Sequence, residues 1–402
     1  MAENKDKKVL NVPNLRFPEF EGEWEECKLG DVAMVVGGGT PDTNNHKYWN
    51  GDIQWFTPSE IGRDKYVTNS LRTISEEGLN KSSAKLLPIG TILLSSRATV
   101  GECSINKVEC TTNQGFQSLI PKEYFSKEFV FYLMQTKRKE LIRKSCGSTF
   151  LEISANEVRK IKIAVPTSKE QEKISKLLAL LDERISTQNK IIEDLKKLKS
   201  AISKYLFERK DLFENKIKLS KVAELKNGYA FQSSKYNALG KWKILTIANV
   251  AGERYVKTNE CNSIIEIPYD IQKHQKLEAN DILISLTGNV GRVSLCTEGL
   301  FLLNQRVGLL QLKVSEDREF IYQVLSFHKF EESMIACAQG AAQMNIGKGD
   351  VENYILPYSF NKENINSVAS VLKNYDKYII NEINMLSMLH SQKQYLLRQM
   401  FI

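Results

Sequence analysis

The chain has 402 residues, of which 42% are hydrophobic and 26% are charged, and its mean hydropathy is −0.33. These values predict a globular protein of two to four domains and argue against a disordered chain or a membrane protein, since no run of about 18 apolar residues occurs. Seven scattered cysteines and an N-terminus without an apolar signal segment favour a cytoplasmic protein with reduced thiols. The net charge of +8 is compatible with a polyanionic partner without requiring one, and the four distant histidines give no metal-binding pattern.

The first part of the chain has the pattern of short strands separated by turns. A β-type opening at Lys28–Val32 leads to a glycine turn at Gly37–Gly39, and the strongest apolar run that follows is Thr91–Ser95. A short helix is expected at Lys127–Arg143, and a last strand ends at Pro166. We therefore predict a strand-rich domain at residues 1–166.

A long helical pattern follows at residues 167–213. From Ile174 to Leu206, apolar residues form two interleaved series that repeat every seven residues, and neither proline nor glycine interrupts them. An amphipathic helix lying on its own domain is the alternative, but it explains the narrow two-position stripe less well. The pattern favours a coiled-coil helix.

The second half of the chain repeats the first. Ile282–Gly291 matches Ile92–Gly101 at an offset of 190 residues, and Arg398–Phe401 matches Lys204–Phe207 at an offset of 194. The same order of elements recurs, with a β-type opening at 217–222 and helical sequence at 318–337. We predict a second strand-rich domain at residues 214–357 and a second long helix at 358–402.

The fold class that follows is α+β. Two tandem strand-rich domains are joined by two long antiparallel coiled-coil helices with pseudo-twofold symmetry. Polar residues that interrupt the heptads suggest a register for the helix pair, in which Gln188 faces Lys393 and Lys199 faces Glu382. Polar layers of this kind fix the register of a coiled coil at some cost in stability.

The sequence contains no recognisable catalytic motif. We find no phosphate-binding loop, no dinucleotide-binding glycine pattern opening a helix, no nucleophile elbow and no Asn-Pro-Pro-aromatic motif of amino-methyltransferases. We therefore predict a chain without catalytic residues and without a metal site.

Several short motifs occur in the same order in the two halves. In the first copy they are Trp24–Val32, Gly39–Pro41, Trp55–Ile61, Gly90–Gly101, Asn113–Phe116 and Pro166–Ile185. Together they resemble the specificity subunits of type I restriction–modification enzymes over the whole chain. The second copy differs in detail, with Leu286–Gly288 in place of Ser96–Ala98 and Arg306-Val307 in place of Gly115-Phe116.

The resemblance implies that each strand-rich domain is a target-recognition domain, which reads one half of a split, asymmetric site in double-stranded DNA. It also implies that the helices set the spacing of the half-sites and dock two modification subunits, which methylate adenine with S-adenosylmethionine. Two restriction subunits that use ATP and Mg²⁺ would complete the complex. The chain itself would hold no cofactor and would not enter a membrane.

Candidate DNA contacts are basic and amide side chains on loops, since arginine and lysine read guanine while asparagine and glutamine read adenine. The candidates are Ser96, Arg97, Thr99, Asn113, Gln114, Arg138, Lys139, Arg143, Thr287, Asn289, Arg292, Asn304, Gln305, Arg306, Gln343, Asn345 and Lys348. Each candidate also has a simpler interpretation. The loops can be structural turns, and the repeated Asn-Gln pairs can be a structural feature that both copies share. The basic residues on the predicted helix can be part of a solvent-exposed face.

Two other functions remain open at this point. One is a coiled-coil scaffold with duplicated protein-binding domains and no role with nucleic acid. The other is a fused restriction or modification enzyme, which the lack of catalytic motifs argues against. Salt-dependent DNA binding distinguishes the first alternative from a DNA-specificity subunit, because contacts to phosphates release counterions.

Overall fold

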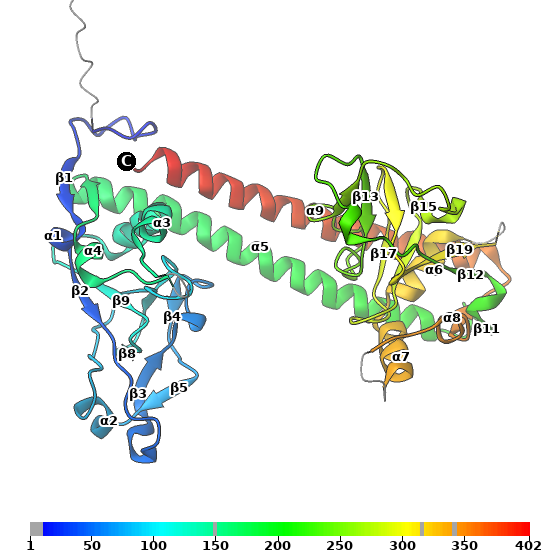
Figure 1. The fold of residues 1–402 in the computed structure, drawn as a ribbon, viewed down its shortest axis with the longest axis horizontal. Helices are drawn as coiled ribbons and strands as arrows, with labels where there is room; N and C mark the ends of the chain where they lie inside the picture. Colours follow the sequence, from blue (N-terminus) through cyan, green and yellow to red (C-terminus); the bar gives the residue numbers. More distant parts are fainter. Residues whose placement is uncertain (1–10, 148–150, 314–316, 340–343) are drawn as a thin grey trace, which may run out of the picture. The chain divides into compact units, whose positions relative to one another are not determined.

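The computed structural model describes residues 11–147, 151–313, 317–339 and 344–402. The chain divides into two compact units, which are described separately. Unit 1 consists of Met1–Thr187 and Leu386–Ile402, and unit 2 consists of Gln188–Met385. Each unit combines β-sheets and short helices with parts of two long helices, so the predicted α+β class is confirmed (Figure 1).

The described residues of unit 1 form three small sheets. A two-stranded antiparallel sheet joins β1 (Glu25–Lys28) to β10 (Lys162–Val165), the first and last strands of this part of the chain. The five-stranded sheet has the order β2 (Ala33–Gly37), β9 (Gln117–Pro121), β6 (Ile92–Leu94), β7 (Cys103–Asn106) and β4 (Tyr66–Val67). The three-stranded sheet has the order β5 (Arg72–Ile74), β3 (Trp49–Phe56) and β8 (Cys110–Thr112).

The core of unit 1 lies between the five-stranded sheet and the helices. Its helices are α1 (Leu29–Val32), α2 (Glu76–Asn80), α3 (Lys127–Lys144) and α4 (Ala155–Arg159), with short 3₁₀ turns at His46–Tyr48 and Pro58–Glu60. Helix α3, predicted almost to the residue, begins at a Ser126 cap and buries a continuous apolar run, 129–134. Phe129 stacks on Phe401, and Trp24 meets both rings edge to face.

Unit 2 repeats this arrangement. A two-stranded sheet joins β11 (Asn215–Lys218) to β20 (Ile355–Tyr358). One four-stranded sheet has the order β12 (Ala223–Asn227), β19 (Val307–Leu312), β16 (Ile282–Ser285) and β17 (Val293–Leu295). The other has the order β14 (Asn262–Ile264), β13 (Trp242–Leu245), β18 (Phe301–Leu303) and β15 (Lys276–Leu277). The parallel pair β13–β18 corresponds to β3–β8 in unit 1, so the internal repeat extends to strand pairing.

The predicted bounds of the two opening strands are wrong. The predicted opening strands end early: β1 and β11 are followed by a turn of helix at Leu29–Val32 and by a 3₁₀ turn at Leu219–Lys221. The helical sequence at 318–337 forms two helices, α6 (Arg318–Ser326) and α7 (His328–Ala338), because Phe327 between them has an extended backbone. A further short helix, α8 (Lys348–Glu352), precedes β20, and three 3₁₀ turns of unit 2 are Leu219–Lys221, Ser233–Lys235 and Lys273–Gln275.

The two long helices are α5 (Ser168–Glu208) and α9 (Lys362–Gln399). Both predicted heptad series are buried where they meet a partner; in unit 1, for example, Leu181 and Ile185 of α5 pack with Leu389 of α9. Within unit 2, Gln188 contacts Glu382 and Lys199 contacts Asp376, so the helices run antiparallel. Among the described residues, no helix is long and apolar enough to span a membrane.

The proposed pairing of polar residues is wrong in its register. Lys199 forms an ion pair with Asp376 at 2.6 Å instead of Glu382, whereas Glu382 accepts a hydrogen bond from Gln188. In unit 1, Lys393 forms an ion pair with Asp182 at 2.7 Å instead of meeting Gln188. The heptads specify which faces meet, but a shift of about two turns preserves those faces and changes every polar partner.

Candidate nucleic-acid interface

Each unit has a tight loop after its central strand, and the two loops have the same backbone hydrogen bonds. In unit 1, Gly101 N donates to Ser95 O at 3.0 Å; in unit 2, Gly291 N donates to Ser285 O at 2.9 Å. Both glycines have positive φ angles, +85° and +79°, which only glycine adopts readily. The loops at 95–101 and 285–291 therefore have the same backbone conformation at this turn.

Two further segments hold each loop from either side. Ser96 N donates to Gly115 O, and Ile153 N donates to Ser96 O, at 2.8 and 3.1 Å. In unit 2, Leu286 N donates to the Arg306 carbonyl and Ile346 N donates to the Leu286 carbonyl, at 3.0 and 2.9 Å. The structure thus brings together three segments in each unit: the loop, the Asn-Gln turn, and the segment before α4 or α8. The sequence predicted candidates on the first two segments in both units, but on the third segment only in unit 2.

Two hydroxyl candidates are buried. Ser96 is fully buried, and its hydroxyl has no hydrogen-bond partner among the described residues. The Thr287 hydroxyl is also buried without a described partner, and the backbone of Thr287 bridges to Asn345. Because both hydroxyls are buried, neither is accessible to DNA in this structure. The prediction that they contact DNA is therefore corrected: both residues have a structural role in the loop. Thr99 is exposed, and its hydroxyl donates to Ser95 Oγ at 3.1 Å.

The asparagines of the two Asn-Gln turns have a structural role. Asn113 Oδ1 accepts the Gly115 amide at 2.9 Å, and Asn304 Oδ1 accepts the Arg306 amide at 3.2 Å. The glutamines that follow are exposed: Gln114 accepts a hydrogen bond from the Thr40 hydroxyl, and Gln305 is held through its backbone amide. The shared structural interpretation therefore holds for the asparagines, while both glutamine side chains remain accessible.

Most basic candidates already have an acidic partner. Arg97 lies 2.8 Å from Glu152, Arg138 lies 2.8 Å from Glu102, and Arg292 lies 3.3 Å from Glu331. Exposed pairs of this kind are weak, so a phosphate can compete for the guanidinium. Lys348 lies 2.7 Å from Glu224, and this hydrogen bond raises the pKa of the lysine and keeps it cationic.

The remaining candidates are exposed. Lys139, Arg143 and Arg306 project to solvent, and none has an ion-pair partner among the described residues. Asn289 and Asn345 are also exposed. Gln343 lies outside the described residues.

The acidic partners were missed by sequence reasoning, although the repeat contains a signal for them. Glu102 of the first copy aligns with Arg292 of the second, and their partners on the following helices, Arg138 and Glu331, also have opposite charges. The ion pair is therefore inverted between the copies. Such an exchange of sign within one chain indicates contact, because two positions that change together with opposite charges usually lie close to each other.

The chain matches the family model described as "Type I restriction modification DNA specificity domain" twice, over residues 21–197 and 213–385. The MjaIX specificity subunit of Methanocaldococcus jannaschii is 36% identical over 197 residues, which are 48% of this chain and 46% of that protein. The EcoR124I/EcoR124II specificity subunit of Escherichia coli is 31% identical over 188 residues, 45% of each chain. The matches thus span about half the length of these two relatives.

Longer but weaker similarity covers nearly the whole chain. The MjaVIII specificity subunit of Methanocaldococcus jannaschii is 24% identical over 405 residues, which cover 93% of this chain and 90% of that protein. The fold is shared with a crystal structure of the S subunit of a type I restriction–modification system from M. genitalium. The TM-score is 0.57 with 16% identity, and 97% of this chain and 99% of that chain are covered. Both matched segments contain the loop assembly described above, and the chain therefore belongs to the family of the type I restriction modification DNA specificity domain.

Proposed function

We propose that this chain is the non-catalytic DNA sequence-specificity subunit of a type I restriction–modification complex. Its target-recognition domains, residues 1–166 and 214–357, each read one half of a split, asymmetric site. The observation that carries the proposal is that the recognition loops of the two units have the same backbone hydrogen bonds but different side chains. Thr99 of unit 1 is replaced by Asn289 in unit 2, and Gly115 by Arg306, which changes the hydrogen-bonding groups offered to base edges.

Arg306 is the strongest candidate for a base contact. Its backbone carbonyl accepts the Leu286 amide at 3.0 Å, and Asn304 Oδ1 holds its amide at 3.2 Å, so the backbone is fixed while the guanidinium remains exposed. A fixed backbone reduces the entropy that the side chain loses when it binds. Arginine is also the residue that most often contacts guanine in the major groove.

The long helices are the proposed docking surface for two modification subunits. Within unit 2, exposed apolar residues recur every seven positions on both helices, each between 41% and 64% exposed: Ile191, Leu198, Tyr205, Val371, Tyr378 and Met385. They occupy the same heptad position on both helices, so in an antiparallel pair the two stripes lie on the same side. A surface of this pattern fits apolar helices of a partner.

The chemistry of the complex belongs to its other subunits. The modification subunits would supply methyl transfer from S-adenosylmethionine to adenine, and two restriction subunits would supply ATP- and Mg²⁺-dependent cleavage in the cytoplasm. The role of this chain is to bind the DNA and to orient it: the recognition loops bind the DNA, and the helices set the spacing between the half-sites. That division of labour requires no catalytic residue in this chain.

Genome-wide mapping of methylated adenines, in cells with and without this gene, tests the proposal. We expect a two-part motif with a fixed spacer that disappears with the gene. Binding of the chain and its modification partner to duplex DNA should weaken steeply with salt, because phosphate contacts release counterions. If methylation is unchanged and no salt-dependent DNA binding is found, the chain is a protein scaffold instead.

A further inference from the structure

A partly buried cluster of charged and polar side chains joins the recognition domain of unit 1 to both long helices. Asp182 of α5 accepts a hydrogen bond from the Tyr132 hydroxyl at 2.7 Å and forms an ion pair with Lys393 of α9 at 2.7 Å. Lys65, from the loop before β4, donates to the Tyr132 oxygen at 2.9 Å. Burial raises the pKa of the Tyr132 hydroxyl, which therefore keeps its proton and donates it to the carboxylate.

Unit 2 contains a corresponding cluster. Asp376 of α9 accepts hydrogen bonds from Gln323 of α6 at 2.6 Å, from Lys199 of α5 at 2.6 Å and from Arg254 at 2.8 Å. Arg254 also forms an ion pair with Glu319 at 2.6 Å. In both units the carboxylate binds a donor from the domain helix and a lysine from the other long helix. The cation from the domain loop binds the carboxylate directly in unit 2, whereas in unit 1 it binds the Tyr132 oxygen.

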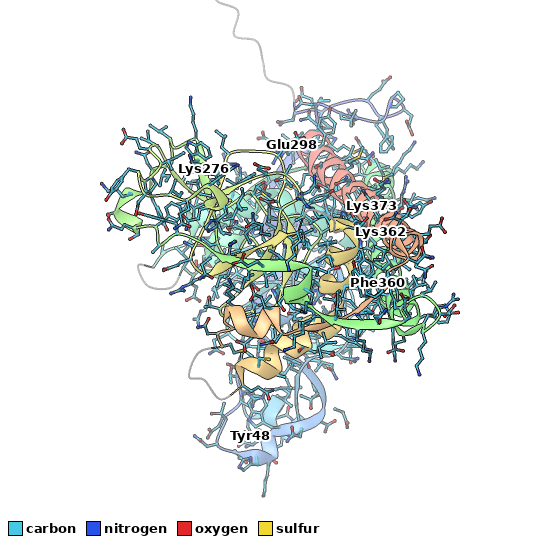
Figure 2. The ribbon with its side chains drawn as sticks, turned by 90° about the vertical axis from the view of Figure 1, so that its right-hand side faces the viewer. Tyr48, Lys276, Glu298, Phe360, Lys362 and Lys373 are labelled. Atoms are coloured by element: carbon cyan, nitrogen blue, oxygen red, sulfur yellow. The ribbon has the colours of Figure 1, made fainter. Side chains whose placement is uncertain are left out.

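The cluster in unit 2 extends to the surface of α9. Lys373, labelled in Figure 2, lies one helical turn before Asp376, and its Nζ is 3.8 Å from Glu319 Oε2. Glu319 is thus bound by Arg254 on one side and approached by Lys373 on the other. The second cluster therefore contains three cations around its two carboxylates.

The two clusters occupy equivalent positions of the internal repeat. Asp182 and Asp376 differ by 194 residues, as do Lys199 and Lys393, which is the offset of the helical segments. Tyr132 and Gln323 differ by 191, the offset that also aligns the flanking residues of α3 and α6. The backbone of the loop cation is held in the same way in both copies, since Ile105 N donates to Lys65 O, and Leu295 N donates to Arg254 O, each at 2.7 Å.

We call each cluster a helix–domain clamp: Lys65, Tyr132, Asp182 and Lys393 in unit 1, and Arg254, Gln323, Asp376 and Lys199 in unit 2. The apolar core beside each clamp holds domain and helices together but is not directional, since burial of apolar area does not depend on angle. Hydrogen bonds and paired charges do depend on angle. A displaced domain would remove the hydrogen bond that Tyr132 or Gln323 donates to the carboxylate and leave only the ion pair between the long helices, which is unfavourable because a largely buried acceptor loses its partner.

We propose that Asp182 and Asp376 are positioning residues, which fix the orientation of the recognition domain of their own unit on the long helices. Through that orientation they restrict the spacer length that the complex accepts. The effect on the spacer rests on the proposed function; the fixed orientation does not.

The orientation is tested in the full chain by the distance between two spin labels within unit 1. Labels at Lys81→Cys, on the recognition domain, and Arg184→Cys, on α5, both occupy exposed positions. The two exposed cysteines, Cys146 and Cys337, are first changed to serine. The other five are buried or half-buried, and burial raises their pKa, so they react slowly with thiol reagents at neutral pH.

The variants are Asp182→Asn, which removes the charge, and Tyr132→Phe, which removes a single hydroxyl and keeps the ring packed. Glu183→Gln is the matched control, because Glu183 is the neighbouring acid and is exposed. We expect a broader distance distribution in both clamp variants and the wild-type distribution in the control. An unchanged distribution in a folded Tyr132→Phe chain overturns the proposal.

The second readout is methylation mapped in cells that carry the same variants. We expect methylation at sites with a spacer one base pair too long or too short to rise about tenfold relative to the correct spacer, equivalent to about 1.4 kcal/mol of lost discrimination. The bases of both half-sites should stay the same, which a general loss of stability would not produce. Broadened distances with an unchanged spacer preference overturn the effect on the spacer. Absence of any split motif in wild-type cells overturns the proposed function, and the label distances then still decide whether the clamp fixes the domain.

Discussion

Gln188 of α5 donates hydrogen bonds from its side-chain amide to Glu382 of α9, to the backbone oxygen at 3.1 Å and to the carboxylate. The two residues are 194 positions apart, the offset of the helical repeat, so each is the counterpart of the other in the second copy. A polar residue at this heptad position therefore meets its own equivalent, and the pair supplies one of the polar layers in the seam between the helices.

The layer predicts a gain in stability when both residues become apolar. The double variant Gln188→Leu, Glu382→Leu should raise the free energy of unfolding by about 1–2 kcal/mol, because a buried polar pair is often less stable than its apolar replacement. Glu382→Leu alone should lower it by about 1–2 kcal/mol, because the Gln188 amide then loses its carboxylate acceptor and keeps only the backbone oxygen. Urea denaturation followed by circular dichroism measures both, and a double variant less stable than either single variant would contradict the prediction.

Alanine substitutions at Arg306 and at Ser96 should have different effects on DNA binding. Arg306→Ala should weaken binding to the specific duplex by about 1–3 kcal/mol, with a smaller effect on random DNA, because an exposed guanidinium on a fixed turn is suited to base contact. Ser96→Ala should leave both affinities unchanged, because that side chain is buried. Fluorescence anisotropy with the modification partner present measures the affinities, and equal loss on both duplexes for Arg306→Ala would assign it to a phosphate.

The exposed apolar stripe predicts a loss of subunit binding without a loss of fold. Leu198→Asp and Tyr378→Asp, singly, should weaken binding of the modification subunit at least about tenfold, because a charge at a buried apolar interface costs several kcal/mol. Their thermal unfolding should match that of the wild type, since both side chains are exposed in the chain itself. Lys196→Asp, at an exposed position outside the stripe, is the control, and equal weakening by the control would argue against the stripe as the interface.

Two glycines of one loop should respond differently to alanine. At Gly291 (φ +79°) a Cβ would lie 2.7 Å from Met334 Cβ, whereas at Gly288 (φ +70°) the nearest atom would be 3.5 Å away. We expect Gly291→Ala to cost about 2–4 kcal/mol, from backbone strain and overpacking together. Gly288→Ala should cost about 1 kcal/mol, and the first copy already has an alanine, Ala98, with φ +57° at this point. Urea midpoints of the two variants provide the comparison, which fails if Gly288→Ala is the more damaging.

Buried thiols predict a loss of stability at alkaline pH. Burial raises the pKa of Cys103, Cys110 and Cys296 to about 12, well above the value of about 8.5 in an unfolded chain. The protonated thiol is favoured by folding, so its contribution is complete below the unfolded pKa and is lost as the pH rises toward the folded pKa. Between the two values each such thiol lowers the unfolding free energy by about 1.4 kcal/mol per pH unit.

The measurement compares urea midpoints at pH 7.5 and pH 9.5. Cys103→Ala should lose stability at both pH values because it leaves a cavity, but its decline between them should be smaller than that of the wild type. A decline equal to that of the wild type would show that the Cys103 thiol does not titrate with folding.

The sequence predicted the long helices and the duplicated domains, because both depend on patterns that occur twice. It did not predict the polar partners of the helices. Asp182 and Asp376 lie outside the two apolar series and look like ordinary surface residues, and only the packing of Tyr132 or Gln323 against them buries the carboxylates. The burial of Ser96 was missed for the same reason, since it depends on Gly115 and Ile153, which are distant in sequence.

The positions of α5 and α9 along the chain have a consequence for synthesis. Helix α5 ends at Glu208 and its partner α9 begins at Lys362, so a complete domain is translated between the two. Because synthesis proceeds at about 5–20 residues per second, α5 leaves the ribosome some tens of seconds or less before α9 is synthesised. Until then, α9 cannot cover the apolar seam of α5. During that interval the nascent chain exposes a row of leucines and isoleucines, so the speed of translation and the availability of chaperones should govern the yield of correctly folded protein.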